Sequence, residues 1–321
     1  MTQHFVSPLA RHLAGFLSFK RARGYQYKRA EFMLHSFDRF LSLLARKKRT
    51  WRLDQAIFAW LADRPDRKAI SVAMDLSVLR EFWRYLHRLD SHRYAREPRW
   101  PILPTEPRFV AHILTKQQIH SLLGLITQLD RPLFRSALYR ALFLVLYCSG
   151  LRIGEALRLR VQDVDFVRRA FYILESKGRS RWVPFHPSLQ GELQRYLQAR
   201  RAFVGEVARS DARLFVSHNR QRLPISTASG TFAGLYRAAG LKPAHGRDGP
   251  RLHDLRHSFA VHRLTRWYRE GADLHSRLPW LSTYMGHVDL LGTETYLTTT
   301  PELLGLAGKR FGNHFRRKRS S

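Results

Sequence analysis

Residues 149–157 have the sequence SGLRIGEAL, and they lie where one apolar helix ends and another begins. Gly150 is expected to end the helix predicted over residues 132–149, because glycine readily adopts the left-handed conformation found just after helices. Arg152 and Glu155 lie three positions apart at the start of the helix predicted over residues 153–160, so they share one face. Such a pair is usually a surface ion pair, so this segment alone does not establish a function.

A second segment, RLHDLRHSFAVHRL (Arg251–Leu264), belongs to a helix predicted over residues 253–270. His253 and Arg256 are three positions apart on one face of it. A guanidinium is a permanent cation with paired donors that match phosphate oxygens. The pair therefore indicates either a chance arrangement in a basic chain or a phosphate clamp.

Between these segments, the helical period gives way to a β pattern in RRAFYILESKGRSRWVPFHP (Arg168–Pro187). Two β-rich runs, residues 171–174 and 181–185, flank a turn that contains Gly178, which predicts a β-hairpin. Lys177 lies at the tip of that hairpin, where a lysine is normally solvated.

Near the C-terminal end, MGHVDLLGTETYLTTT (Met285–Thr300) places His287 nine residues before Tyr296. A tyrosine hydroxyl is a poor nucleophile near neutral pH, so a reactive role for Tyr296 requires activation by neighbouring cations. The alternative is a packing residue at the edge of a short helix, predicted over residues 293–297.

Apolar residues at helical spacing predict a four-helix domain over residues 1–97. Four prolines between residues 98 and 109 predict a semi-extended linker, because proline fixes φ and removes a donor. A second domain is expected over residues 110–305, followed by a basic tail at 306–321. In the second domain we predict further helices over residues 188–203, 227–239 and 281–286, and a loop extension over residues 272–280.

The composition indicates a polyanionic partner. The chain has 321 residues, with 56 Lys and Arg against 25 Asp and Glu, a formal net charge of +31. Such an excess favours nucleic acid through counterion release. The longest apolar run, Ala141–Cys148, is far shorter than the ~20 residues that cross a bilayer. Cys148 is the single cysteine, which excludes an internal disulfide and a cysteine-rich zinc site.

No one of these motifs is decisive, but their order along the chain resembles that of the tyrosine recombinase (phage integrase) family. The family's motif boxes match SGLRIGEAL, HDLRHSFA, the hairpin ESKGRSRWVPF, and MGH followed by TETY. The resemblance covers most of the chain and implies a mainly α protein. It predicts a helical core-binding domain, then a mostly helical α/β catalytic domain with a small antiparallel sheet.

The resemblance implies a site-specific recombinase that cuts and rejoins DNA through a 3′-phosphotyrosyl intermediate, without a metal, ATP or another cofactor. Tyr296 is then the nucleophile, and Arg152 and Arg256 hold the phosphate. Lys177 is the expected general acid. The remaining expected residues are His253 for proton transfer, His287 on a non-bridging oxygen and Glu155 as a support for these groups.

Double-stranded DNA is the expected partner, bound mainly through its phosphates. The candidate binding residues are Arg46, Lys47, Lys48, Arg49, Arg84, Arg88, Arg179 and Arg181. The resemblance also implies a homo- or hetero-tetramer on DNA, in which the C-terminal helix around residues 301–311 docks on the next subunit. The expected location is the cytoplasm, at the bacterial nucleoid, with no role for a membrane.

Two other functions are compatible with parts of this pattern. A type IB topoisomerase uses similar residues to relax DNA, and a catalytically idle regulator would only bind it. The ordered residue set argues against the regulator, since binding alone does not need Lys177 and Tyr296. The helical pattern begins near Ser7, which favours a two-domain recombinase of a mobile element. The sequence does not separate transposition from phage integration, cassette movement or dimer resolution.

Overall fold

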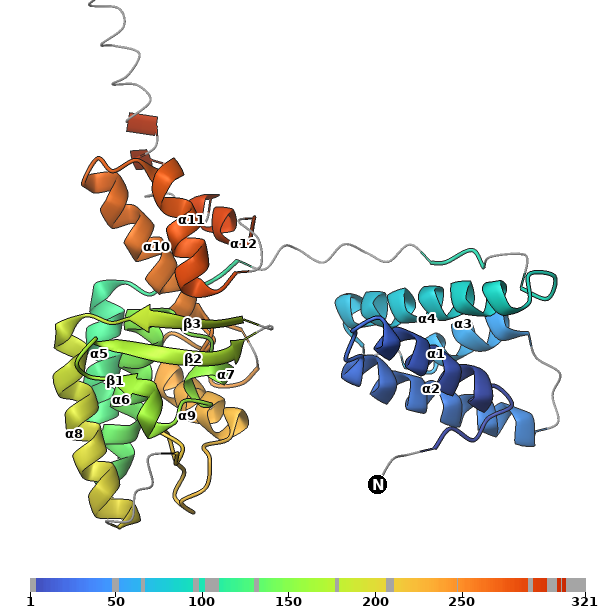
Figure 1. Cartoon of the computed structure of the whole chain (residues 1–321), viewed down its shortest axis with the longest axis horizontal. Helices are drawn as coiled ribbons and strands as arrows, with labels where there is room; N and C mark the ends of the chain where they lie inside the picture. The colour runs from blue at the N-terminus through green and yellow to red at the C-terminus, as the bar shows by residue number, and fades with distance from the viewer. Residues whose placement is uncertain are drawn as a thin grey trace, which may run out of the picture. The chain divides into compact units, whose positions relative to one another are not determined.

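A computed structural model of the chain describes residues 4–47, 52–64, 67–94, 98–101, 110–129, 133–176, 179–205, 211–246, 248–287, 291–298, 305–306 and 308–309. The chain divides into two compact units, Met1–Arg108 and Phe109–Ser321 (Figure 1). Most of the predicted linker, residues 102–109, lies outside the described part. No helix in the described part is long and apolar enough to span a bilayer.

In its described residues, the first unit contains four helices packed around an apolar core, as the sequence predicted. They are α1 (Ala10–Ala22), α2 (Lys28–Arg46), α3 (Leu53–Ala62) and α4 (Ala69–Leu89). Phe16, Phe37 and Phe82 are buried at its centre. The carboxylate of Asp38 is also buried, and it accepts hydrogen bonds from the backbone N–H groups of Val6 (2.8 Å) and Ser7 (3.0 Å). These bonds satisfy N–H groups just before α1, which lack partners within the helix.

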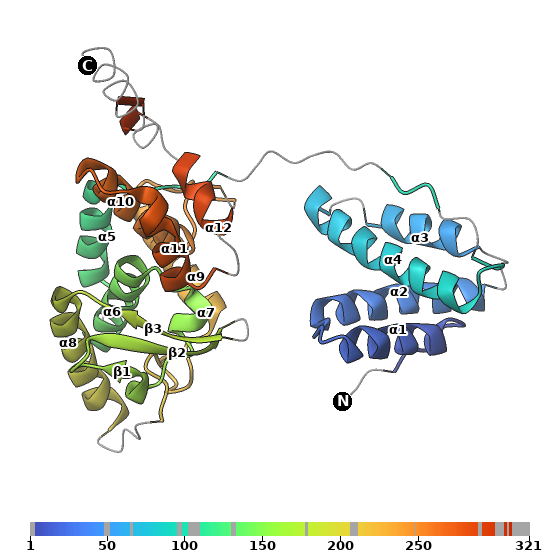
Figure 2. The same cartoon turned by 45° about the horizontal axis from the view of Figure 1, so that its top comes forward.

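The second unit begins with helices and a small sheet that share one core. Its first elements are α5 (Lys116–Thr127), α6 (Leu133–Ser149), α7 (Ile153–Ala156), the 3₁₀ turn η1 (Val161–Asp163), β1 (Val164–Asp165), β2 (Ala170–Ser176), β3 (Arg179–Pro184), α8 (Pro187–Val204) and α9 (Ile225–Ala238). The strands form an antiparallel sheet in the order β1-β2-β3, which confirms the predicted hairpin. Figures 1 and 2 show the sheet lying against helices α6 and α8.

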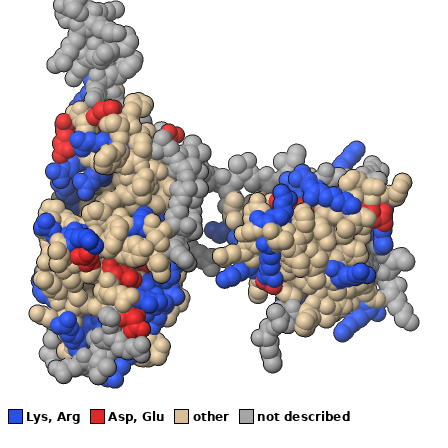
Figure 3. All heavy atoms as spheres, viewed as in Figure 1, with Lys and Arg blue, Asp and Glu red and all other residues tan. Residues whose placement is uncertain are grey.

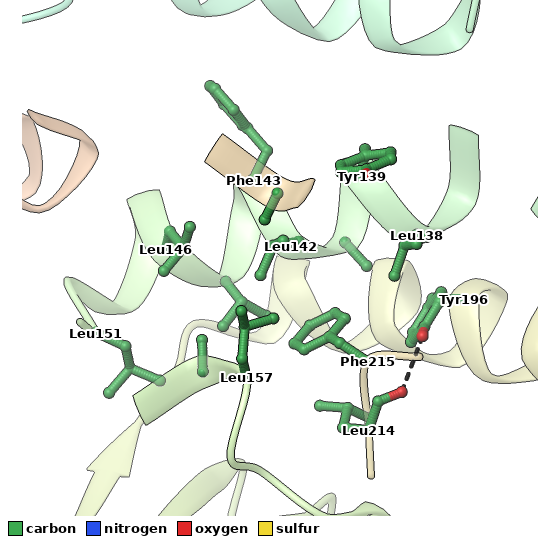
Figure 4. Packing of buried hydrophobic residues seen from close by; sticks show 14 of the residues in the cluster. Leu138, Tyr139, Leu142, Phe143, Leu146, Leu151, Leu157, Tyr196, Leu214 and Phe215 are labelled. Atoms are coloured by element: carbon green, nitrogen blue, oxygen red, sulfur yellow. Dashed lines mark hydrogen bonds between the residues drawn. The ribbon is translucent and has the colours of Figure 1, made fainter. Parts of the chain in front are cut away.

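Helix α6 forms the centre of this core. Its Leu138, Leu142 and Leu146 are almost fully buried and belong to one cluster with Leu157 and Phe215 (Figure 4). The hydroxyl of the buried Tyr196 donates a hydrogen bond of 2.8 Å to the carbonyl of Leu214, so a polar group in this core has its partner (Figure 4).

The remaining elements build a separate apolar cluster near the C-terminal end. They are α10 (Asp254–Arg269), α11 (Leu274–Met285), α12 (Leu291–Glu294) and the 3₁₀ turn η2 (Thr295–Thr298). The cluster includes Phe259, Leu281, Met285 and Tyr296. Tyr296 therefore contributes its ring to a core, which bears on the reactivity of its hydroxyl.

The structure corrects two predicted elements. The helix expected over residues 153–160 ends at Ala156, because the chain turns there to bury Leu157 and Leu159. The loop expected over 272–280 is largely helical, since α11 begins at Leu274. The side chain of Asp273 accepts the N–H of His275 at 3.0 Å and caps the helix, which continues through Pro279.

Gly150 generates a prediction about stability. Its φ is +60°, and a Cβ placed there would lie 2.4 Å from Cδ1 of Phe259. We expect Gly150→Ala to lower the stability of the second unit by roughly 2–4 kcal/mol, from left-handed strain together with overpacking. Thermal unfolding followed by circular dichroism measures this.

Gly124→Ala is the matched control, because a Cβ at this exposed position in α5 would meet nothing within 4 Å. We expect that variant to be as stable as the wild type or more stable by up to about 1 kcal/mol. Equal melting temperatures for the two variants would contradict the close approach of Gly150 to Phe259.

Candidate active site

The candidate catalytic residues that the structure describes lie near the ends of three helices and in the turn η2. Arg152 is the residue before α7, His253 is the residue before α10, and His287 follows the last turn of α11. Arg256 lies in the first turn of α10, and Tyr296 lies in η2. Lys177, at the predicted hairpin tip, lies outside the described residues.

Glu155 is a buried carboxylate of the site, with a side chain only 1% exposed. Its Oε1 accepts a hydrogen bond from Nη1 of Arg152 at 2.9 Å, and its Oε2 accepts the backbone N–H of Arg152 at 3.0 Å. A charge this deep requires close pairing, because burial of an unpaired ion is very unfavourable. Glu155 therefore fixes both the backbone and the guanidinium of Arg152.

Arg152 and Arg256 also hold the C-terminal end of α11. Nη2 of Arg152 donates to the carbonyl of Gly286 at 3.0 Å, and Nη2 of Arg256 donates to that of Met285 at 2.9 Å. Nη1 of Arg256 donates to the carbonyl of Gly150 at 2.6 Å. Burial, reinforced by the nearby charge of Arg152, lowers the pKa of Arg256 to about 10, so it remains a cation at neutral pH.

Tyr296 is 4% exposed, and its ring packs between two histidines. The ring centroid of His257 lies 5.4 Å away at an edge-on angle, and that of His287 lies 6.2 Å away in a stacked orientation. Burial raises the pKa of the Tyr296 hydroxyl, while Arg256 and Arg152 act in the opposite direction. The phenol is therefore protonated at rest and lies within the field of two cations.

The three histidines of the site lie in different surroundings. Nδ1 of His287 lies 2.7 Å from Oγ1 of Thr293, which fixes its ring next to Tyr296. Part of His253 is exposed, yet loss of solvation, with nearby His257 and arginines, lowers its pKa to about 4. His257 makes an edge-on contact with His253, and its own pKa is also lowered, chiefly by burial. Both rings are neutral near pH 7.

Two residues of the candidate active site, His257 and Arg181, were not predicted as such from the sequence. His257 was not singled out, although it lies one helical turn after His253 and directly follows Arg256. Arg181 was expected to bind DNA, but its guanidinium points into the protein. Its Nη2 donates to Oε2 of Glu155 at 3.0 Å and to the carbonyl of Met285 at 3.2 Å. The side chain of Arg179 is outside the described part.

The other candidate DNA-binding residues lie in the first unit. Arg46, Lys47, Arg84 and Arg88 are all exposed, and the guanidinium of Arg88 lies over the ring of Phe19. Lys48 and Arg49 lie outside the described residues. On the face of each unit drawn in Figure 3, lysine and arginine side chains outnumber acidic ones.

The arrangement suits a tetrahedral anion whose charge rises during a reaction. It combines fixed guanidinium donors, a nearby phenol and neutral histidines that can accept a proton. A phosphate diester attacked by the phenol oxygen would have these requirements, because its transition state gathers charge on the non-bridging oxygens.

Known proteins resemble this chain along most of its length. Residues 112–302 match the phage integrase family. The chain is 37% identical over 307 residues to a putative integrase/recombinase, y4rB, of Sinorhizobium fredii, covering 92% of this chain and 94% of that protein. It is 30% identical over 254 residues to the tyrosine recombinase XerC of Lacticaseibacillus casei, covering 77% and 78% of the two chains.

Among solved structures, the Tn1549 transposon integrase in complex with transposon right end DNA has a similar fold. The TM-score is 0.64 at 16% identity, over 94% of this chain and 98% of that one. The recombinase XerH bound to palindromic difH DNA gives a TM-score of 0.62 at 18% identity, over 88% and 78%. The extent of the family match and the identity to y4rB place this chain in the phage integrase family, the tyrosine recombinases that cut and rejoin DNA strands.

Proposed function

We propose that this chain recombines DNA at specific sites, with Tyr296 as the nucleophile. The Tyr296 oxygen bonds to a backbone phosphorus as its proton leaves, and the bond from phosphorus to the 5′-oxygen breaks. The products are a 3′-phosphotyrosyl bond and a free 5′-hydroxyl. The observation that carries this proposal is the buried Tyr296 phenol beside Arg256 and Arg152, the cations that lower its pKa against the effect of burial.

Arg152 and Arg256 would bind the non-bridging oxygens of the attacked phosphate. Their guanidinium groups are already anchored to the carbonyls of Gly286, Met285 and Gly150, so little reorganisation is needed when charge develops. Preorganised donors of this kind typically contribute ~10²–10³ in rate. His287, fixed by Thr293, would donate to another of these oxygens.

Proton transfer needs a group at each end of the reaction. His253 would take up the tyrosine proton, directly or through His257, whose ring lies between His253 and Tyr296 in the chain of ring contacts. The 5′-oxygen must gain a proton as it leaves, and we assign this step to Lys177 of the hairpin. Reversal by a 5′-hydroxyl from another strand would complete the exchange.

DNA binding would rely on the exposed cations of the first unit, Arg46, Lys47, Arg84 and Arg88, with Lys48, Arg49 and Arg179 as further contacts. We also propose assembly as a homo- or hetero-tetramer on DNA, with the C-terminal helix docked on the neighbouring subunit, and a role in a mobile element at the bacterial nucleoid. A similarity to the transposon integrase and to the proteins named as recombinases favours this over relaxation by a type IB topoisomerase.

The nucleophile can be tested by Tyr296→Phe, which removes the attacking oxygen and leaves the buried ring. We expect no covalent adduct with a nicked duplex that carries the recombination site, while affinity for the duplex stays within about twofold, since most contacts go to phosphates elsewhere. The adduct is measured on a denaturing gel.

Tyr268→Phe, also on the edge of the α10–α11 cluster, is the control and should form the adduct at the wild-type rate. An adduct of normal yield from Tyr296→Phe would refute the assignment of the nucleophile.

The lowered pKa of His253 predicts how the reaction depends on pH. Above its pKa of about 4 the ring is neutral and can accept a proton, so acidification removes the base only near that value. We expect the single-turnover rate of adduct formation to be constant from pH 7.5 to about 5.5, below the ordinary histidine pKa of 6.5, and to fall under that range. His253→Gln should lower the rate and abolish this dependence.

A wild-type rate that already halves near pH 6.5 would mean that His253 titrates like a solvated histidine, contrary to this expectation.

The DNA-binding role of α4 predicts a change in salt dependence. Replacing both Arg84 and Arg88 by alanine should weaken binding and reduce the slope of log affinity against log salt by about 2, one counterion for each lost phosphate contact. The adduct rate at saturating DNA should not change, and an unchanged salt slope would remove both residues from the interface.

A further inference from the structure

Arg181 makes more hydrogen bonds to the active site than a DNA-binding residue needs. Its Nε donates to the carbonyl of Tyr284 at 3.0 Å and its Nη2 donates to that of Met285 at 3.2 Å. Nη1 and Nη2 also donate to Glu155, at 3.3 Å from Oε1 and 3.0 Å from Oε2. The side chain is 13% exposed, and all three guanidinium nitrogens donate hydrogen bonds within the protein.

These bonds connect three parts of the chain that the reaction needs. Arg181 lies on β3, the strand that leads away from the Lys177 hairpin. Glu155, its ion-pair partner, also holds the guanidinium of Arg152. The carbonyls of Tyr284 and Met285 belong to the last turn of α11, directly before His287.

The position of Arg181 also explains why residue 286 is a glycine. Gly286 has a φ of +67°, and a Cβ placed there would lie 2.7 Å from both Cζ and Nη1 of Arg181. A flexible side chain could usually move aside, but this guanidinium is held by bonds to Glu155 and two carbonyls. A side chain at residue 286 would therefore displace Arg181 from them.

The charges indicate what Arg181 does for Arg152. Glu155 is shared between two guanidinium groups, and its carboxylate is oriented by both. Without Arg181, only Arg152 of this pair would remain to satisfy the buried carboxylate, and the guanidinium that should face a phosphate would be drawn toward it. The α11 carbonyls would lose a donor at the same time.

We propose that Arg181 is a positioning residue for strand cleavage: it orients Glu155 and the end of α11, and through them Arg152 and His287. This inference rests on the proposed function, because the cleavage it supports is the attack by Tyr296. In this role Arg181 would act through Glu155 and α11, without touching the DNA or the reacting atoms.

The test measures the single-turnover rate constant of adduct formation on a nicked duplex at saturating concentrations of Arg181→Lys and Arg181→Gln. We expect both to slow the reaction by about 10–100-fold, as losses of supporting partners do in metal sites. Lysine keeps the charge but cannot reproduce the fork of bonds to Glu155 and the carbonyls. A loss of folded protein lowers the amplitude of the reaction, whereas mispositioning lowers its rate constant.

Arg168→Gln is the matched control. Arg168 follows β1 in the same sheet region and is also paired with a carboxylate, Asp165, but its side chain is 72% exposed. The Arg168→Gln substitution removes the same charge as Arg181→Gln without changing the active site, so the rate constant of this variant should equal that of the wild type. A DNA-binding role for Arg181 would instead weaken affinity and leave the saturated rate constant unchanged, which would overturn the proposal.

Gly286→Ala provides a second, independent measurement, since it displaces the guanidinium without removing it. We expect it to slow adduct formation about tenfold or more in the wild-type background, and by a clearly smaller factor in Arg181→Gln, where its clash partner is gone. Equal factors in the two backgrounds would contradict the proposed contact.

The outcomes separate this inference from the proposed function. If the wild type forms no adduct with Tyr296, the proposed function fails and the inference fails with it. If the wild type reacts and both Arg181 variants keep its rate constant, only the inference is overturned.

Discussion

The burial of one carboxylate, that of Glu155, imposes the constraint on which the rest of the site depends. An ion removed from water is unfavourable by several kcal/mol unless charges and donors surround it. Here Arg152, Arg181 and the backbone N–H of Arg152 supply them. Meeting this requirement brings the start of α7 next to β3. The same arginines then reach the end of α11, so one buried charge fixes the positions of groups that are far apart in the sequence.

The C-terminal end of α11 positions most of the arginines of the site. The last carbonyls of any helix lack partners within it, and in α11 arginines from three other segments satisfy them. Because a helix C-terminus carries partial negative charge, it also stabilises the cations gathered there. The cations of the site are thus held together by backbone oxygens and a buried carboxylate, and not by surface ion pairs.

Much of this arrangement was predictable, and the misses have physical causes. Spacing in the sequence paired Arg152 with Glu155 and His253 with Arg256. In the structure each pair spans the start of a helix, with the first residue just before the helix and the second in its first turn. The spacing did not reveal that Glu155 is buried, since burial depends on what packs over α7. A loop was predicted over residues 272–280 because this segment is longer than the family pattern, although Leu274, Leu278, Leu281 and Met285 follow a helical spacing and are all buried. Arg181 was interpreted from its charge alone, yet it pairs with the buried Ile173 across the hairpin. It also lies on the same strand face as the buried Val183, two residues further on, and this period of two already indicated an inward side chain.

The hydroxyl of Ser258 links the start of the second unit to α10. The hydroxyl of Ser258 donates to the carbonyl of Asp254 at 2.8 Å and accepts the backbone N–H of Leu114 at 2.9 Å. Leu114 is fully buried and lies just before α5, close to where the chain enters this unit, and Ser258 lies two residues after Arg256. The segment that enters the second unit is therefore hydrogen-bonded to α10, the helix that contains Arg256. A pull on the segment before Leu114 would therefore act on α10 through this hydrogen bond, two residues after Arg256.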